Sequence, residues 1–409
     1  MTLDAPFLLK ILRTVLCALA VAAATTPLAK WLAKKLGAVD VPRDGRRMHD
    51  HPIPRMGGLA IILGFLTAVL LFLDIDREVR GILIGAGIIA ILGMFDDIYD
   101  LHAGLKFLVQ IGAAIVVTLH GCRIEHISGW QLPLWLSYPV SVLWIVALTN
   151  AVNFIDGLDG LAAGVCAICA SSMLIVALLA MPDGSAGESA ILLAAVAGAC
   201  IGFIPYNFNP AKIFMGDTGS TFLGFVLSSV SIYGLFKTYA AISFAAPFLV
   251  LGLPIFDVCY AVIRRVSHGI SPMHADRSHM HHKLIDLGFS QKQAVAICYL
   301  ISAMLGLAAV VLTGNGFVQA LVFLAALLLA GFVGVRIFAG KRREPTREDK
   351  NETDSGPCRL RHAAGSHQNG APGPHACRAA GDREPVLPDG AAPRNAGFRD
   401  ADIPPGGAV

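Results

Sequence analysis

Long apolar segments follow one another along most of the chain, and this succession limits the fold more than any other feature. A helix that crosses a bilayer needs about 20 mostly apolar residues, and segments of roughly that length recur from residue 9 to residue 338. Only 15% of the residues are charged and the mean hydropathy is +0.64, whereas soluble domains carry about 25% charged residues. The sequence therefore predicts an all-α, polytopic integral membrane protein.

Eleven segments are candidate transmembrane helices, and two of them, near 80–95 and 106–120, are short with soft boundaries. The other nine lie near 9–29, 56–73, 133–151, 161–181, 188–205, 219–235, 239–262, 293–313 and 316–338. No segment shows the alternation of a membrane barrel strand. Residues 1–339 are thus expected to form one transmembrane domain.

The segment from 340 to 409 has a different composition, rich in Pro, Gly, Ala, Arg and His and without periodicity. Such a segment cannot bury enough apolar area to offset the entropy of ordering. It is predicted to be a disordered cytoplasmic tail, and we assign it no chemistry.

Basic residues indicate the orientation of the chain. They are concentrated in the loops 30–55 and 263–292 and after the last span, whereas the opposite loops hold only Arg77, Arg80, Arg123 and Lys237. Loops rich in Lys and Arg face the cytoplasm. We expect the basic side to be cytoplasmic, with the N-terminus outside and the C-terminus inside.

The start of the chain offers a second interpretation, because Ala22–Ala24 follows a basic, apolar segment and is similar to a signal-peptidase site. Cleavage there would leave the seven basic residues of 30–55 outside the membrane. We therefore predict a retained first helix.

Net charge and cysteine content exclude two other classes of protein. The net charge is only +3 and no basic patch with interleaved aromatic residues is present, so nucleic acid is not an expected partner. Cys166 and Cys169 have the spacing of a redox motif but lie within an apolar segment. Exposed thiolates would be needed for redox or metal chemistry, so we predict that these cysteines pack in the core.

Acidic, amide and histidine side chains gather in the loops of the basic side, which is the strongest functional signal in the chain. Asp96 and Asp97 end the third span. Adjacent carboxylates repel each other unless a cation lies nearby, and a general base or a metal site uses such a pair. The alternative is a solvated helix end.

Two further loops carry acids beside glycines. Asn153, Asp156 and Asp159 would stand at i, i+3 and i+6 if the segment were helical, and a polar turn that caps the sixth span is the alternative. Asp217 lies in a glycine-flanked loop that opens the eighth span. The N–H groups of that loop would favour a phosphate and Asp217 would hold Mg²⁺, with a simple N-cap as the alternative.

The last cluster contains Arg277, His279, His281 and His282. These side chains are suited to a diphosphate as donors and cations. A zinc site and a solvated basic loop are the alternatives.

Together, carboxylates for Mg²⁺, a glycine loop and a His/Arg cluster are the parts that phosphoryl transfer requires. Their membrane setting suggests that one substrate is a lipid. A secondary transporter is the alternative from another class, but it would carry ionisable residues inside its spans. Here Asp257 is the main charged residue within a span.

Six blocks of the sequence resemble, in order, the polyprenyl-phosphate N-acetylhexosamine-1-phosphate transferases, which form glycosyltransferase family 4. The blocks are 46–58, 95–97, 106–110, 153–160, 214–220 and 276–282. The family resemblance implies transfer of a sugar-1-phosphate from a UDP-sugar to undecaprenyl phosphate with release of UMP. It also implies that residues 1–339 form the catalytic domain.

The resemblance also implies roles for single residues. Asp217 matches the ligand of Mg²⁺, with Mn²⁺ as an alternative ion. Asp96 matches the acid that deprotonates the lipid phosphate or attacks directly, and Asp97 matches its partner. The nucleotide and metal pocket would be lined by Asn153, Asp156 and Asp159, and the phosphates would be handled by Lys106, Arg277, His279, His281 and His282.

The histidine cluster favours one branch of the family. The branch that transfers phospho-N-acetylmuramoyl-pentapeptide usually has three consecutive histidines, whereas this chain has His279, Met280, His281 and His282. The pattern resembles the branch that uses UDP-N-acetylglucosamine to start O-antigen, common-antigen or teichoic-acid linkage units. Other UDP-N-acetylhexosamines and UDP-MurNAc-pentapeptide stay open as substrates, and a homodimer stays open as the assembly.

Overall fold

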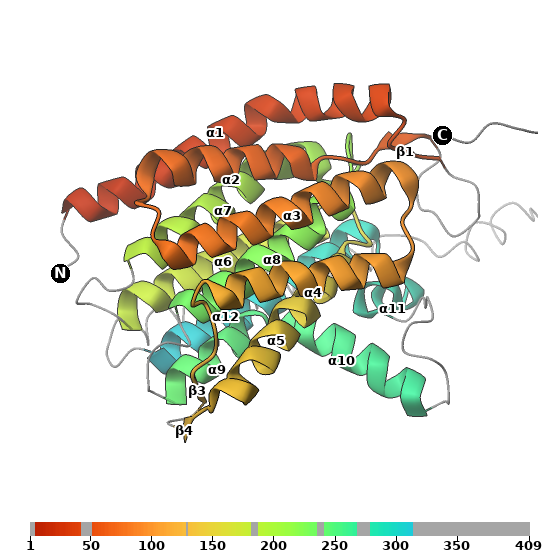
Figure 1. The fold of residues 1–409 in the computed structure, drawn as a ribbon. Coiled ribbons are helices and arrows are strands. Elements are labelled where there is room, and N and C mark those ends of the chain that lie inside the picture. The colour runs from red at the N-terminus through yellow and green to blue at the C-terminus, as the bar shows by residue number, and fades with distance from the viewer. Residues whose placement is uncertain are drawn as a thin grey trace, which may run out of the picture. The chain divides into compact units, whose positions relative to one another are not determined.

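The computed structural model describes residues 5–41, 51–127, 130–180, 187–234, 241–267 and 279–313. Six helices within these residues are long and apolar enough to cross a membrane, and Gly58–Phe72 and Ala103–Leu119 are shorter apolar helices. The chain is an all-α polytopic membrane protein, as predicted (Figure 1).

The helices of the described residues are numbered in chain order. They are α1 (Ala5–Leu36), α2 (Gly58–Phe72), α3 (Arg77–Tyr99), α4 (Ala103–Leu119), α5 (Leu134–Ile155), α6 (Leu161–Ala180), α7 (Gly187–Asn207), α8 (Gly216–Gly234), α9 (Ala241–Val250), α10 (Gly252–Ser267), α11 (Met280–Asp286) and α12 (Gln291–Thr313). Two-residue strands form two antiparallel pairs, β1 (Val39–Asp40) with β2 (Ile53–Pro54) and β3 (His126–Ile127) with β4 (Trp130–Gln131).

Nine of the eleven predicted spans coincide with one helix each, from α1 to α8 and at α12. The prediction of a single helix over 239–262 is wrong, because α9 ends at Val250 and α10 begins at Gly252. Pro254 explains the break, since it has no N–H to donate to the carbonyl of Val250 and its ring would clash with that carbonyl. The predicted span 316–338 and the tail 340–409 lie outside the described residues.

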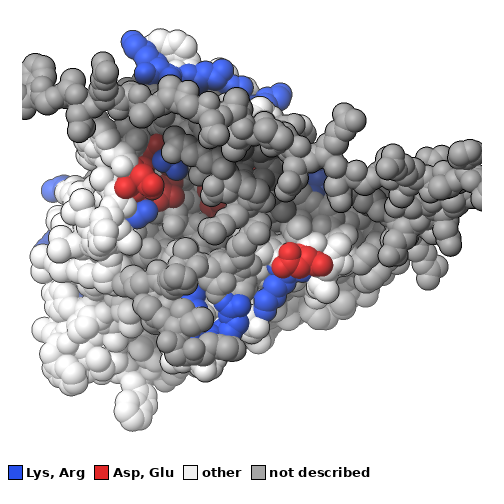
Figure 2. Space-filling view, turned by 90° about the vertical axis from the view of Figure 1, so that its right-hand side faces the viewer, with Lys and Arg blue, Asp and Glu red and all other residues white. Residues whose placement is uncertain are grey.

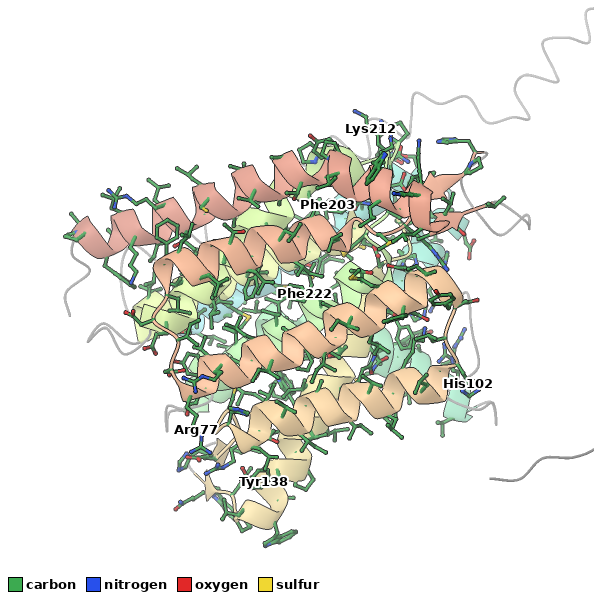
Figure 3. All side chains as sticks on the ribbon, turned by 45° about the horizontal axis from the view of Figure 1, so that its top comes forward. Arg77, His102, Tyr138, Phe203, Lys212 and Phe222 are labelled. Atoms are coloured by element: carbon green, nitrogen blue, oxygen red, sulfur yellow. The ribbon has the colours of Figure 1, made fainter. Side chains whose placement is uncertain are left out.

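Helix α8 lies at the centre of the helical unit, and every residue from Thr218 to Gly234 is buried. It packs against α2, α3, α5, α6 and α7, while α1 packs on α2 and α7 on the other side (Figure 1). Figure 3 shows Phe203 of α7 and Phe222 of α8 between the helices, and both side chains are buried. The small residues of α8 allow this close packing on several sides.

Glycines let α2 and α3 approach the first turn of α8. A Cβ on Gly58 would lie 2.1 Å from the nitrogen of Gly219, and one on Gly93 would lie 2.5 Å from the Cα of Thr218. Larger side chains at either position would push the helices apart. The start of α8 is therefore fixed against the end of α3, where the predicted acidic pair stands.

The cysteine prediction also agrees with the structure. Cys166 and Cys169 are buried free thiols in α6, at 1% exposure each. They pack in the core, as expected for an apolar helix.

Candidate active site

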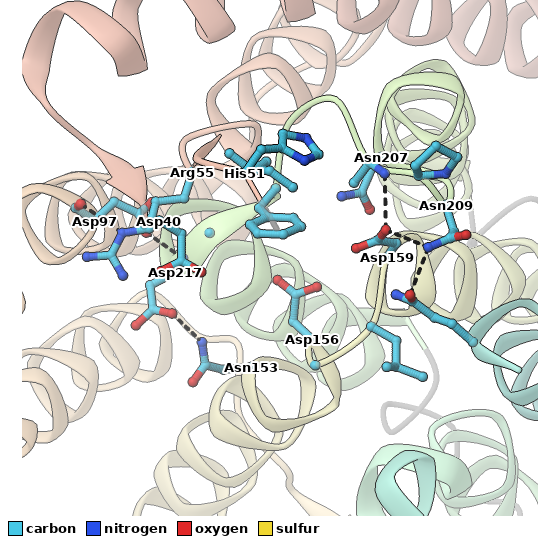
Figure 4. A pocket seen from close by; sticks show the side chains of 18 of the residues that line it. Asp40, His51, Arg55, Asp97, Asn153, Asp156, Asp159, Asn207, Asn209 and Asp217 are labelled. Atoms are coloured by element: carbon cyan, nitrogen blue, oxygen red, sulfur yellow. Dashed lines mark hydrogen bonds between the residues drawn. The ribbon is translucent and has the colours of Figure 1, made fainter. Parts of the chain in front are cut away.

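The polar ends of several helices meet around a pocket of about 520 Å³. Figure 2 shows acidic and basic side chains gathered in a hollow of the face that it draws. Figure 4 shows the pocket from close by. Six predicted site residues line it, namely Asp97, Asn153, Asp156, Asp159, Asp217 and His282. The structure thus brings together residues that lie up to 185 positions apart, from Asp97 to His282.

Asp97 accepts hydrogen bonds from the first turn of α8. Its Oδ1 accepts from the nitrogen of Asp217 at 3.0 Å, and its Oδ2 accepts from the nitrogen and the hydroxyl of Thr218 at 3.1 and 2.6 Å. The carboxylate therefore occupies the anion position at a helix N-terminus. The prediction that these N–H groups are free for a phosphate is wrong, because Asp97 takes two of them.

Gly216 makes this contact sterically feasible. Its φ is +72°, and a Cβ at this position would lie 2.4 Å from Oδ2 of Asp97. Any other L-residue would be strained at that φ and would collide with the carboxylate. Gly216 thus allows the Asp97 carboxylate to reach the first turn of α8.

Asp96 points away from Asp97, toward α4. Its Oδ2 lies 2.8 Å from Nζ of Lys106, and its Oδ1 accepts from the nitrogen of Leu101 at 2.8 Å. Nζ of Lys106 also lies 3.2 Å from Oδ2 of Asp217. Lys106 is therefore the cation that the adjacent acids were expected to need, and it joins Asp96 to Asp217.

Asn153 holds Asp217 from the opposite side. Its Nδ2 donates to Oδ1 of Asp217 and to Oγ of Ser220, both at 2.9 Å. Asp217 is thus fixed between α4 and α5, with its side chain still about one-third exposed. That exposure leaves the carboxylate accessible to an incoming ion or substrate.

The loop after α5 is a turn and not a helix. Because α5 ends at Ile155, the helical spacing considered for Asp159 does not exist. Oδ2 of Asp159 accepts from Nδ2 of Asn209 at 2.9 Å and from the nitrogen of Ala211 at 3.0 Å. Nδ2 of Asn209 in turn donates to Gln291 at 2.7 Å. Asp159 thus secures the segment before α8 as well as lining the pocket.

Asp156 lies between the two sides of the pocket (Figure 4). Burial, together with the negative charges of Asp217, Asp97 and Asp159, raises its pKa to about 8. The Asp156 carboxyl is therefore largely protonated at neutral pH without a bound cation. A cation bound nearby would favour its ionised form.

The histidine cluster depends on Asp257. Nδ1 of His279 donates to Oδ2 of Asp257 at 2.8 Å, and the nitrogen of Met280 donates to Oδ1 at 2.7 Å. Asp257 is 3% exposed. The main charged residue that the sequence places inside a span thus anchors the start of α11.

His281 and His282 differ in environment. Burial and the neighbouring charge of His282 lower the pKa of His281 to about 3, so this imidazole is neutral and not the cation that the sequence suggested. Its buried Nε2 has no hydrogen-bond partner among the described residues and lies against Gly157. His282 lines the pocket itself, and Arg277 lies outside the described residues.

The donor atoms of the pocket suit a hard cation. Within the described ranges, no group of three or more His, Cys, Asp or Glu side chains is placed to hold a metal ion. Mg²⁺ commonly binds through one or two carboxylates together with waters and substrate phosphates. Asp217, with Asp156 and the amide of Asn153 nearby, fits that type of site, whereas the set lacks the converging ligands of a zinc site.

Several residues that line the pocket had no role predicted from the sequence. They are Asp40, His51, Arg55, Asn207, Asn209 and Gln291. His51 and Arg55 lie within the block 46–58, and Asn207 and Asn209 lie shortly before the block 214–220, and this position was the available signal. Asp40 and Gln291 carry none, because only the fold brings the ends of α1 and α12 to the pocket.

A profile of "Glycosyl transferase family 4" matches residues 79–235, which contain Asp96, Asp97, Asn153 and Asp217. A relative from Bacillus subtilis, named "Probable undecaprenyl-phosphate N-acetylglucosaminyl 1-phosphate transferase", is 40% identical over 296 residues. That match covers 70% of this chain and 80% of the relative.

Two further relatives agree. The "Decaprenyl-phosphate N-acetylglucosaminephosphotransferase" of Mycolicibacterium smegmatis is 35% identical over 303 residues, covering 66% of this chain and 74% of the relative. The "Undecaprenyl-phosphate alpha-N-acetylglucosaminyl 1-phosphate transferase" of Salmonella typhi is 30% identical over 316 residues, covering 75% and 85%.

A helical membrane protein with this acid and lysine cluster, and with these relatives, belongs to glycosyl transferase family 4. The resemblance to the N-acetylglucosamine-1-phosphate branch, inferred from the motifs, is confirmed by the relatives. All three relatives are bacterial, which together with the apolar helices indicates a bacterial membrane protein.

Proposed function

We propose that the chain transfers N-acetylglucosamine-1-phosphate from UDP-N-acetylglucosamine to undecaprenyl phosphate, releasing UMP and leaving a lipid-linked sugar diphosphate. The observation that carries the proposal is the Asp96–Lys106–Asp217 bridge beside a pocket of about 520 Å³. A pocket of that size accepts a nucleotide sugar. The names of the relatives support the choice of sugar and lipid.

The geometry favours a single in-line displacement. Both oxygens of Asp96 are engaged, one by Lys106 and one by the nitrogen of Leu101, and the residue is 3% exposed. A carboxylate held in this way is poorly placed to attack phosphorus and form a covalent intermediate. In this proposal Asp96 and Lys106 orient the lipid phosphate, and its oxygen attacks the β-phosphorus of the nucleotide sugar while UMP leaves.

The other predicted residues complete the site. Asp217 holds Mg²⁺, or Mn²⁺ in its place, with Asn153 fixing the carboxylate. The ion supplies charge neutralisation to the transferring phosphoryl group. Asp97 fixes the first turn of α8, Asp156 and Asp159 line the nucleotide side, and His282 enters the pocket from α11.

The positive-inside distribution of Lys and Arg supports an active site that faces the cytoplasm from the inner membrane. The product would then start a cell-surface polysaccharide such as O-antigen in lipopolysaccharide, or another cell-wall polymer. A homodimer stays a prediction, which the mass of the detergent-solubilised protein would check.

The test uses purified protein in detergent with undecaprenyl phosphate, Mg²⁺ and a panel of UDP-sugars, and follows UMP release. Release with UDP-N-acetylglucosamine alone is the expected result. Release only with another UDP-N-acetylhexosamine or with UDP-MurNAc-pentapeptide would change the substrate and keep the chemistry. Flux across proteoliposomes without UMP release would instead favour the transporter.

A further inference from the structure

Arg55 lies on a short segment that is fixed on both sides. Its own nitrogen donates to the carbonyl of Ala38 at 2.9 Å. The nitrogen of Phe214 donates to the carbonyl of Pro54 at 2.8 Å, and the nitrogen of Gly57 donates to the carbonyl of Phe214 at 2.9 Å. Arg55 is thus held between the end of α1 and the loop that opens α8.

The side chain of Arg55 is aimed by the acidic pair. Its Nε donates to the backbone carbonyl of Asp97 at 3.1 Å, and the residue lines the pocket. Figure 4 draws it beside Asp97 and Asp217, with Asp159 and Asn209 on the far side and Asp156 between. The carbonyl contact uses one donor of the guanidinium and leaves the two terminal nitrogens for another partner.

Within the part of the chain that the structure describes, no carboxylate pairs with those terminal nitrogens. Although Asp97, Asp156 and Asp217 line the same pocket, Arg55 forms no ion pair with any carboxylate of the described residues. Lys106, in contrast, is already shared by Asp96 and Asp217. Arg55 is therefore a cation with a fixed direction and spare donors, which is the arrangement that binds a phosphate in bidentate fashion.

The two cations, Lys106 and Arg55, stand in different surroundings. Lys106 belongs to α4, whose neighbouring residues Leu105, Phe107 and Leu108 are exposed and apolar, as suits a side that meets lipid. Arg55 stands on the side of the pocket near Asp40 and His51, and the pocket extends from there across to Asp159 and Asn209. A polar pocket of this extent fits a nucleotide sugar better than a polyprenyl chain.

We propose that Arg55 binds the diphosphate of the nucleotide-sugar donor, opposite the cation that handles the lipid phosphate. The inference rests on the proposed function and adds a residue to it. As the bond to the β-phosphorus breaks, negative charge grows on the departing UMP. A guanidinium at that diphosphate stabilises the charge and lowers the barrier.

The test compares Arg55→Gln and Arg55→Lys with the wild-type protein. Gln can still donate to the carbonyl of Asp97 but carries no charge. Lys keeps the charge but replaces the two terminal nitrogens of the guanidinium with a single ammonium group. Arg80→Gln is the matched control, because Arg80 is exposed and lies near the start of α3, far along the helix from Asp97. Thermal unfolding in detergent verifies that all variants fold.

We expect Arg55→Gln to lower kcat/KM for UDP-N-acetylglucosamine about 100-fold, the size found when one donor to developing charge is removed. The kcat/KM of Arg55→Lys should lie between those of the wild type and of Arg55→Gln. The KM for undecaprenyl phosphate should stay unchanged in both variants. In equilibrium titrations without turnover, UDP should bind at least tenfold more weakly to Arg55→Gln, while uridine should bind equally to both proteins.

Three outcomes would overturn the assignment. Unchanged kinetics and UDP affinity in both variants would show that Arg55 binds no substrate phosphate. A raised KM for undecaprenyl phosphate with unchanged UDP affinity would move Arg55 to the acceptor. Equal weakening of UDP and uridine would indicate a disturbed pocket. Because UDP binding is measured directly, a wild-type protein that binds UDP but releases no UMP would refute the proposed reaction and leave this inference standing.

Discussion

Two parts of the site are built by different means. The acid cluster of Asp96, Asp97, Lys106 and Asp217 stands on the ends of α3, α4 and α8, and each acid is held by at least two hydrogen bonds or ion pairs. The histidine arm, residues 279–286, is a loop and a seven-residue helix. It depends on Asp257, which accepts from His279 and Met280.

The side chains of the two regions are held in position in different ways. Side chains from α3, α4 and α5 hold the acid cluster against the start of α8, so removing one contact leaves the others in place. The histidine arm is too short to be stable alone, so one carboxylate determines much of its position. We therefore expect the chemistry to depend most on the first region, and the second to respond to a single change outside the pocket.

The largest expected effect is that of Asp217→Asn. If Asp217 holds the ion that neutralises the phosphoryl group, its loss removes several kcal/mol of transition-state stabilisation, on the order of a 1,000-fold drop in kcat. UMP release at a range of Mg²⁺ concentrations measures it, with Asp74→Asn, an exposed acid between α2 and α3, as control. Normal turnover of Asp217→Asn at low Mg²⁺ would disprove the metal assignment.

Asp97→Asn should have a large effect on both folding and activity. The carboxylate accepts from three donors, and an amide offers one oxygen while its NH₂ faces N–H groups. Hydrogen bonds to a charged group contribute about 1.5–3 kcal/mol each, so we expect a lower thermal midpoint than for Asp217→Asn.

Thermal unfolding and kcat of the two variants are measured side by side. Equal stability of Asp97→Asn and the wild type would mean that the start of α8 does not need this carboxylate. The residues of the acid cluster would then not hold one another in place.

Asp257→Asn tests the other region. Losing a carboxylate that orients an imidazole typically costs about 10- to 100-fold, so we expect a tenfold or larger drop in kcat/KM with little change in thermal midpoint. His279→Gln should be no worse than this variant, since both act through the same contact. A loss as large as that of Asp217→Asn would contradict this expectation, because the histidine arm would then matter as much for turnover as the acid cluster.

The sequence predicted the membrane class and most of the helices because apolar length and composition are local properties. It also predicted which acids gather, because alternate loops of a polytopic chain face the same side of the membrane and these acids lie in such loops. It did not predict which groups these acids contact. That Asp97 caps α8 and that Asp257 anchors His279 are contacts over 120 and 22 positions, and only packing creates them. The break before α10 was missed because the apolar run continues across it.

The smallest expected effect concerns protons at Asp156. Its pKa is raised to about 8, so most molecules carry a proton there at pH 7. A bound divalent cation favours the carboxylate and expels that proton. Mg²⁺ affinity should therefore rise with pH, at most about tenfold per unit, and level off above pH 8. Titration calorimetry in two buffers of different ionisation enthalpy measures the released proton. Asp156→Asn should abolish the release and Asp74→Asn should not. A wild-type protein that binds Mg²⁺ without releasing a proton would show that Asp156 is already ionised in the pocket.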